Sequence, residues 1–441
     1  MFARSGNIVL GLIGFAAISS AATGPCDLYQ TGNTPCVAAH STTRALFGSY
    51  AGNLYQVRRK SDNTTKDIGV LSAGGEANSA TQDLFCANTT CTISMIYDQT
   101  SNHNDLTKAP GGGFPTAGLE ANATTAKIKL NGRTVYGVYS TGAFEPSAGV
   151  GYRNNKTKGL ATGDAAEAMY MIVDGKHVNQ WCCFDYGNAE VNTKDNGAGT
   201  MEAVYFGKST QWGKGSGTGP WVMADLEDGV YAGKAFTDPG QSVSWTSDYV
   251  MAMLKGDTKN HWALKGGDAQ KGTLKSLYDG VRPSAVASGK YDPMRKEGAI
   301  VLGIGGDNSH TAEGTFFEGC IVTGYPSNAT DDAVQANVVA AGYGSTVTSV
   351  QTRGGMRQPS FHARLASSDI DLEFNLETAG HVRIRLVDLQ GRVAAMLVDA
   401  DRTPGNHLVR WNTGTLRAGL YSLVMENDAQ HIQSTPLLVT R

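Results

Sequence analysis

Short apolar runs with alternating polar residues recur between residues 24 and 342 of the chain. Side chains of a β-strand point alternately to two faces, so this pattern predicts half-buried strands rather than amphipathic helices. Gly-, Asn- and Asp-rich turns separate the runs, which is typical of a sandwich or barrel. The predicted strands are TISMIYDQ (92–99), AMYMIVDG (168–175), MEAVYFG (201–207), WVMADLE (221–227), DYVMAMLK (248–255), AIVLGIGG (299–306) and TFFEGCIVTG (315–324).

Helical periodicity is limited to few places. The best candidate is DDAVQANVVAAG, residues 331–342, where apolar residues recur at helical spacing and two aspartates stand at the start. The composition agrees with this pattern, because 55 glycines and a charged fraction of 17% suit a protein with many turns. We therefore predict an all-β fold, with residues 24–342 as one domain.

The pattern changes after residue 342. Residues 343–360 lack apolar periodicity and are interpreted as a linker. Residues 361–441 return to short alternating strands, which predict a small Ig-like β-sandwich of the size of an independent module. Its predicted strands are IDLEFNL (370–376), HVRIRLVDL (381–389), VAAMLV (393–398), HLVRW (407–411), LYSLVM (420–425) and TPLLVT (435–440).

The N-terminus has the layout of a secretory signal peptide. MFAR carries a positive charge, IVLGLIGFAAI is an apolar run, and ISSAA supplies small residues near a cleavage site. We expect residues 1–22 to be removed and the mature chain to be secreted or displayed at the cell surface. The run is too short to span a bilayer, so the mature chain is expected to have no transmembrane segment. The alternative is a buried N-terminal strand or helix.

The formal net charge of −3 indicates neither a nucleic-acid partner nor an anionic membrane surface.

Export makes disulfides plausible for the seven cysteines. Spacing suggests three local pairs, although spacing cannot establish connectivity. Cys320 lies in a strand-like run and is expected to be a buried free thiol. A zinc site at CANTTC is disfavoured, because no His/Cys pair follows at ligand-like spacing, and no metal is predicted. The suggested pairs are Cys26–Cys36, Cys86–Cys91 and Cys182–Cys183.

Two motifs place carboxyl groups where chemistry can occur. In WVMADLEDG (221–229), strand geometry puts Asp225 and Glu227 on one face with Trp221 and Met223. Two acids on one face repel unless they are solvated or used, and the alternative is a strand that runs out into solvent. In VLGIGGDNSH (301–310), Asp307 follows a glycine pair that lets the backbone approach a ligand. An Asp-Asn turn without chemistry is the alternative there.

Hydrolysis of a polysaccharide requires two carboxyl groups that flank the scissile bond, and it commonly uses aromatic platforms for the sugar. Trp212 and Trp221 are candidates for such platforms, although tryptophans more often lie in a core.

Eight segments together carry a dense family resemblance: GPCDLYQTGNTPCVAAHSTTRALF, FCANTTCTISMIYDQTSNHNDLT, GYRNNKTKGLATGDAAEAMY, CCFDYGNAE, GAGTMEAVYFG, GPWVMADLE, KEGAIVLGIGGDNS and GTFFEGCIVTGYPS. With these segments, residues 24–342 closely resemble the catalytic domain of the α-L-arabinofuranosidase B family, glycoside hydrolase family 54. The resemblance implies a concanavalin-like β-sandwich. It also implies an enzyme that releases terminal arabinofuranose from arabinan and arabinoxylan with retention, without a metal or cofactor.

The resemblance also implies residue roles. Glu227 corresponds to the nucleophile and Asp307 to the acid/base. Cys182 and Cys183 correspond to a vicinal disulfide that contacts the sugar as a compact, polarizable plate, the alternative being two reduced, packed cysteines. The remaining residues with an implied place beside the sugar are Trp212, Asp225, Asp228 and Gly306.

The chain departs from the family at three places. Members usually have Asn where Asp228 stands, so the site gains a negative charge, and His310 occupies a position that is usually small or amide-bearing. The fungal members also carry an arabinose-binding β-trefoil, for which residues 361–441 are too short. Instead, DLQGR (388–392), PGNH (404–407), Trp411 and LRAGLY (416–421) resemble C-terminal sorting domains of the type IX secretion system.

That second resemblance implies a bacterial source and the type IX machinery as a partner. A plain β-sandwich spacer is the alternative, because a fold alone does not determine a role.

Three functions remain open at this stage. The first is an exported retaining α-L-arabinofuranosidase acting on arabinose-containing polysaccharide or oligosaccharide. The second is a related β-xylosidase or β-galactofuranosidase, and the third is a carbohydrate-binding protein that has lost catalysis.

Overall fold

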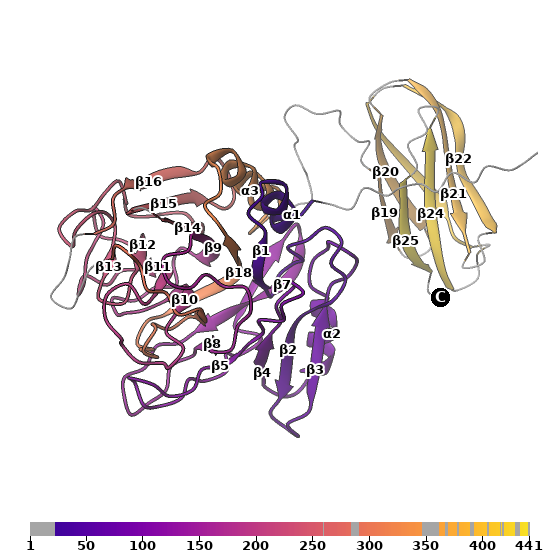
Figure 1. The fold of residues 1–441 in the computed structure, drawn as a ribbon. Helices are drawn as coiled ribbons and strands as arrows, with labels where there is room; N and C mark the ends of the chain where they lie inside the picture. The colour runs from indigo at the N-terminus through magenta and orange to yellow at the C-terminus, as the bar shows by residue number, and fades with distance from the viewer. Residues whose placement is uncertain are drawn as a thin grey trace, which may run out of the picture. The chain divides into compact units, whose positions relative to one another are not determined.

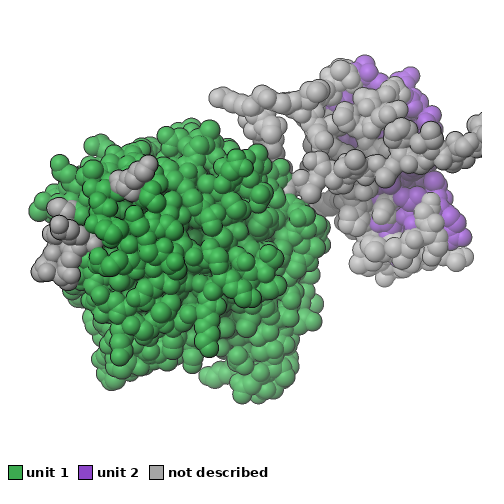
Figure 2. Space-filling model, in the orientation of Figure 1, with its two compact units in different colours: residues 1–348 green, residues 349–441 purple. Residues whose placement is uncertain are grey.

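The computed structural model describes residues 23–258, 260–283 and 291–345, and residues 361–439 apart from seven short gaps. The chain divides into two compact units, residues 1–348 and 349–441 (Figure 2). The predicted signal peptide and most of the predicted linker lie outside the described residues, so the predicted domain limits stay predictions. The seven gaps in the second unit are 367–368, 377–378, 389–391, 404, 415, 417–418 and 428–432.

Two large antiparallel sheets form the first unit (Figure 1). The eight-stranded sheet has the order β16 (Lys275–Gly280), β15 (His261–Asp268), β14 (Tyr249–Asp257), β9 (Glu167–Asp174), β18 (Gly314–Thr323), β7 (Arg133–Ser140) and β6 (Ala126–Leu130), with β1 (Cys36–Ser41) also paired to β18. The ten-stranded sheet has the order β13 (Val230–Tyr231), β12 (Trp221–Asp225), β11 (Glu202–Gly207), β10 (Asp185–Ala189), β17 (Ala299–Leu302), β8 (Tyr152–Asn154), β5 (Leu106–Lys108), β4 (Cys91–Ile96), β2 (Asn53–Arg59) and β3 (Thr65–Gly69).

The two sheets pack face to face, and strands of both contribute side chains to one apolar core. Ile172 of β9 and Ile321 of β18 belong to the same buried cluster as Val204 of β11 and Val222 of β12. β9 and β18 lie next to each other inside their sheet and are buried along almost their whole length. This arrangement confirms the prediction of an all-β sandwich.

The predicted helix is present, but it begins earlier than predicted. Helix α3 (Asn328–Ala340) starts three residues before the predicted segment 331–342, because the hydroxyl of Ser327 accepts the backbone N–H of Thr330 and so caps the helix. Two short helices, α1 (Pro25–Thr31) and α2 (Ser79–Phe85), were not predicted.

A buried charge cluster fastens α3 to the eight-stranded sheet. Asp331 accepts hydrogen bonds from Lys255 of β14 at 2.7 Å and from Lys265 of β15 at 2.6 Å. The side chains of Asp331 and Lys255 are fully buried and that of Lys265 nearly so. Two ammonium groups inside the protein therefore depend on one carboxylate.

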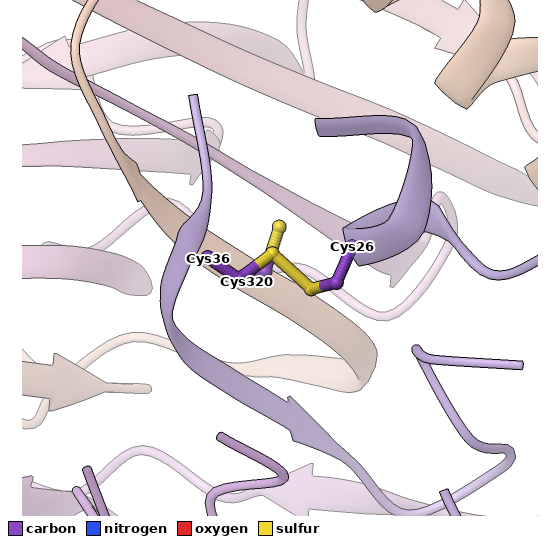
Figure 3. A group of neighbouring side chains, drawn as sticks. All are labelled: Cys26, Cys36 and Cys320. Carbon is purple, nitrogen blue, oxygen red and sulfur yellow. A yellow bond between two sulfur atoms is a disulfide. The ribbon is translucent and has the colours of Figure 1, made fainter. Parts of the chain in front are cut away.

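The three suggested disulfides, Cys26–Cys36, Cys86–Cys91 and Cys182–Cys183, are all present. Cys26–Cys36 joins α1 to β1. Cys320 on β18 is free and buried, as predicted, and its sulfur lies beside that disulfide (Figure 3).

The second unit is a smaller sandwich, described by itself. Its three-stranded sheet has the order β19 (Phe361–Ala366), β20 (Asp369–Leu376) and β23 (Gly405–Asn412), and its four-stranded sheet has the order β22 (Val393–Arg402), β21 (Gly380–Val387), β24 (Gly419–Asn427) and β25 (Gln433–Val439). Alternate residues of β20 and β21, such as Leu372 and Ile384, share one core. All six strands predicted from alternation are present, while β19 was not predicted.

We predict that Asp331→Asn lowers the free energy of unfolding of the first unit by about 3 kcal/mol, because both buried ammonium groups lose their counter-ion. Urea denaturation followed by tryptophan fluorescence measures this loss. Asp332→Asn, at the exposed neighbouring position, is the matched control and should change stability by less than about 0.5 kcal/mol. Equal effects of the two variants would contradict the role given to Asp331.

Candidate active site

A pocket of about 310 Å³ opens on the face of the ten-stranded sheet that points away from the main core. The segment before β10, the loop after β12 and the loop after β17 contribute to its wall. It is lined by Phe114, Phe144, Trp181, Cys182, Cys183, Asp195, Met201, Gln211, Trp212, Asp225, Glu227, Asp228, Val230, Gly305, Gly306, Asp307, Ser309 and Thr311.

Alternation along β12 directs its side chains into two separate clusters. Val222 and Ala224 join the main core, whereas Trp221 and Met223 join a second cluster beneath the pocket. Asp225 follows on this second face with a relative exposure of 4%. The alternative of a strand that runs out into solvent is therefore wrong.

Glu227 does not belong to β12, contrary to the prediction that it shares a strand face with Asp225. The strand ends at Asp225, and Glu227 lies in the following turn with a left-handed φ of 81°. This conformation is uncommon for a residue with a side chain. Here the backbone N–H of Glu227 donates to Asp225 Oδ1 at 3.0 Å, so Asp225 holds the turn that directs Glu227.

Asp307 lies in a turn of the loop after β17. Its Oδ1 accepts the backbone N–H of Ser309 at 2.9 Å, which is the Asp-based turn considered as the alternative. The turn does not exclude a functional role, because Asp307 also lines the pocket together with Glu227.

The glycine pair before Asp307 has a steric reason. A Cβ atom on Gly306 would overlap Glu190 Oε2 and lie 2.9 Å from Glu227 Oε2. Only glycine lets the loop backbone pass this close to two carboxyl groups.

The Cys182–Cys183 disulfide lies in the pocket wall and is almost fully buried. The hydroxyl of Thr311 donates to the carbonyl of Cys182 at 2.6 Å, which ties the disulfide to the far side of the Asp307 loop. The alternative of two reduced cysteines does not hold in this structure.

The two candidate tryptophans have different places. Trp212 lines the pocket with 44% of its surface exposed, so its ring is available to a sugar. Trp221 is 2% exposed beneath the disulfide and donates from its indole N–H to the carbonyl of Ser216 at 2.8 Å. Trp221 is therefore a core residue and not a stacking platform.

Two of the aspartates that line the pocket, Asp225 and Asp228, lie in strongly acidic surroundings. Burial, together with Glu190 and Asp307, raises the pKa of Asp225 to about 8. Asp185 is fully buried, and burial, together with the nearby Asp225, raises its pKa well above the ordinary value. Asp228 lines the pocket as implied, and burial and Asp195 raise its pKa.

Two residues of the site were not identified from the sequence, although each lies in a segment that carries the family resemblance. Glu190 is fully buried, and its carboxyl group lies next to that of Glu227 beside Gly306. Arg153 is 2% exposed and donates to the carbonyl oxygens of Gly306, at 2.5 Å, and of Glu190. Nothing in the local pattern distinguishes either residue, because both act on segments distant in the sequence.

His310 is buried in the loop after Asp307, and its ring lies within hydrogen-bond distance of the carbonyl oxygens of Asn308, at 2.9 Å, and Ser147, at 3.2 Å. It does not line the pocket, so its contacts support the loop rather than the pocket wall.

Among the described residues, two groups of His, Cys, Asp or Glu are close enough to hold a metal ion. They are Cys26, Cys36 and Cys320, and Cys182, Cys183 and Asp225. In each group two sulfurs are joined in a disulfide, so neither offers the thiolate set of a zinc site. Within the same part of the chain, no helix has the length and hydropathy needed to cross a membrane.

Comparison with known proteins gives one consistent result. The family described as "Alpha-L-arabinofuranosidase B, catalytic" matches residues 25–344. The chain is similar to the alpha-L-arabinofuranosidase B of Aspergillus oryzae, with 53% identity over 345 residues, 77% of this chain and 66% of the relative. The chain thus spans slightly less than two thirds of that relative's length. It is also similar to an arabinofuranosidase/B-xylosidase of Trichoderma koningii, with 53% identity over 350 residues, 78% of this chain and 67% of the relative.

Solved structures agree. An arabinofuranosidase complexed with arabinofuranosyl-alpha-1,2-xylobiose superimposes with a TM-score of 0.69 and 42% identity, covering 92% of this chain and 81% of that one. A GH54 α-L-arabinofuranosidase soaked with a cyclic sulfate inhibitor gives the same values.

We predict that the Tm of Asp225→Asn, measured relative to that of the wild type, increases as the pH rises. The folded-state pKa of Asp225, about 8, lies above the unfolded value, so the stability from its protonated form is fully present below about pH 4. That contribution is lost as the pH rises through about 8, whereas an asparagine does not titrate.

Thermal unfolding at pH 5, 7 and 9 tests this prediction. Asp248→Asn, at a side chain that is 70% exposed, is the control and should show no such trend. A difference in Tm between Asp225→Asn and wild type that stays constant from pH 5 to pH 9 would contradict the prediction.

Proposed function

Since the chain belongs to the alpha-L-arabinofuranosidase B family, we propose that it is a retaining exo-α-L-arabinofuranosidase that releases terminal arabinofuranose from arabinan or arabinoxylan. One observation carries the proposal. Glu227 and Asp307, on loops after two different strands, line a single pocket together with a sulfur plate and an exposed tryptophan. This combination supplies two carboxyl groups and a sugar platform in one place.

The proposed mechanism is a double displacement. Glu227 attacks the anomeric carbon while Asp307 protonates the departing oxygen, and Asp307 then takes a proton from the water that releases arabinose. Retention requires the two carboxyl groups to lie about 5 to 5.5 Å apart. No step requires a metal or cofactor.

The remaining pocket residues are proposed to hold the sugar. Trp212 stacks on it, the Cys182–Cys183 disulfide supports its apolar face, and the backbone of Gly306 allows close approach. Asp225 and Asp228 accept hydrogen bonds from its hydroxyl groups, which their positions in the pocket wall support.

A second candidate activity is β-xylosidase. The Trichoderma koningii relative carries both activities in its name, at 53% identity. A binding protein without catalysis is disfavoured, because both carboxyl groups needed for hydrolysis line the same pocket.

We propose further that the chain is exported and that residues 361–441 act as a type IX sorting domain. Three disulfides suit an oxidising compartment. The sorting role rests on the sequence resemblance and on the compact sandwich that this segment forms.

The export proposal predicts that the chain, produced in a bacterium with type IX secretion, appears outside the cell with an N-terminus between residues 22 and 24. Mass spectrometry of the secreted protein measures that end. A chain truncated after residue 348 should stay inside the outer membrane, and secretion of the truncated chain at the wild-type level would refute the sorting role.

The hydrolytic proposal predicts that the mature protein hydrolyses p-nitrophenyl α-L-arabinofuranoside. Glu227→Ala and Asp307→Ala should each lower kcat by about 10³-fold or more, because each removes a group of the double displacement. The rate of nitrophenolate release at saturating substrate measures kcat.

Asp248→Asn, an exposed carboxyl group that does not line the pocket, serves as the control and should keep wild-type rates. Full activity of Glu227→Ala would rule out its role as nucleophile. Activity of the wild type on the β-xyloside alone would select the second candidate.

A further inference from the structure

A second carboxyl group lies behind the proposed nucleophile and has no role in the mechanism so far. Glu190 follows β10 directly, and its side chain is fully buried. Its carboxyl group lies beside that of Glu227, because a Cβ on Gly306 would overlap Glu190 Oε2 and lie 2.9 Å from Glu227 Oε2. A carboxylate has no proton to donate, so a hydrogen bond between two carboxyl groups requires one of them to be protonated. Glu190 Oε2 is buried and has no hydrogen-bond partner among the described residues, so a proton held between the two carboxyl groups would satisfy it.

We propose that Glu190 is a positioning residue for Glu227: in the reactive state it carries the shared proton and donates it as a hydrogen bond to the nucleophile. This inference rests on the proposed function, because it assigns the reactive, anionic form to Glu227.

The location of Glu190 favours the neutral form. Its Oε1 accepts the hydroxyl of Thr200 at 3.2 Å, and its Oε2 is buried where a Cβ on Gly306 would overlap it. A negative charge at such a place is costly, whereas Glu227 is open to the pocket and to the positive charge that develops on the sugar.

Charged groups on every neighbouring segment bear on this pair. Asp225 of β12, Asp195 and Asp307 are acidic, and Arg153 of β8 supplies positive charge. Arg153 donates to the main-chain carbonyls of Glu190 and Gly306 and not to the Glu190 carboxyl group. A second full negative charge on the pair would therefore add to an already acidic site. Burial raises the pKa of both groups, and the contact between them raises the pKa of Glu227 further while it lowers that of Glu190. One retained proton thus lies on Glu227 in the free pair, and the proposal concerns the reactive state, in which Glu227 is the anion.

The donated hydrogen bond acts in both chemical steps. In the first, the anionic Glu227 is held in one orientation toward the anomeric carbon. In the second, Glu227 leaves as a carboxylate that the Glu190 O–H stabilises at once. Glu190 keeps its proton throughout, so the proton balance between Asp307, the leaving group and water is unchanged.

Two variants separate this role from a simple charge. Glu190→Gln keeps a donor to Glu227, so we expect kcat within about 10-fold of wild type and an unchanged acidic limb of kcat/KM against pH. Glu190→Met has a similar length but no donor. It should lower kcat by about 10²-fold and move the acidic limb to higher pH, because the anionic form of Glu227 loses its hydrogen bond.

Glu297→Gln is the matched control. Glu297 accepts the backbone N–H of Val191, next to Glu190, at 2.9 Å, and does not line the pocket. This variant should keep the wild-type profile.

Other outcomes overturn the inference. If both Glu190 variants move the acidic limb to lower pH, Glu190 is anionic in the reactive state. Wild-type kinetics of a folded Glu190→Met would show that the donor is dispensable. If Glu190→Met does not fold, the acidic limb of kcat/KM in Glu190→Gln decides alone. An unchanged limb supports a neutral Glu190, and a limb at lower pH shows that Glu190 is anionic.

Infrared difference spectroscopy keeps the test independent of activity. At neutral pH the wild type should absorb as one more protonated carboxyl group than Glu190→Gln, whether or not arabinofuranosides are substrates, while the bands of Asp185 and Asp225 cancel in the difference spectrum. Equal carbonyl absorption of the two proteins would overturn the shared proton. If the wild type has no activity on arabinofuranosides but Glu190→Gln still loses the carbonyl absorption, the proposed function is wrong and the shared proton stands.

Discussion

The burial of several carboxyl groups around the guanidinium of Arg153 is the constraint on which the site depends. Like charges repel strongly where water is excluded, so such a group of acids is stable only if protons or cations compensate some of them. The raised pKa values of Asp225 and Asp185 indicate compensation by protons, and Arg153 supplies a cation near Glu190, Glu227 and Asp307. Burial in this fold therefore favours the protonated forms of Asp185 and Asp225.

The sandwich provides the rigidity that this arrangement needs. One face of the ten-stranded sheet packs on the main core, and the other carries the pocket. Because β12 alternates strictly, Val222 and Ala224 anchor the strand while Asp225 points to the opposite side. Asp225 then holds the backbone of Glu227, so the position of the proposed nucleophile derives directly from the pleat of the strand.

Much of this could be predicted from local pattern. Alternation identified β9, β11, β12, β14 and β18 and six strands of the second unit, since it depends on neighbouring residues alone. The limits were less accurate. The predicted strand 299–306 ends at Leu302, because the glycines that follow turn the chain toward Asp307, and α3 starts early because Ser327 caps it. The roles of Glu227 and Asp307 came from the family resemblance. Local spacing alone did not favour a catalytic role for either residue.

The sequence by itself determined the all-β class, and it suggested the cysteine pairs and the candidate carboxyl groups, because periodicity, spacing and motif are properties of neighbouring residues. Only the tertiary structure decided which tryptophan faces the pocket, and that Glu190 and Arg153 belong to the site. Arg153 reaches carbonyls 37 and 153 residues away, and Glu190 meets Glu227 across two intervening strands of chain. Such contacts form only when distant segments are packed together, so no local pattern contains them.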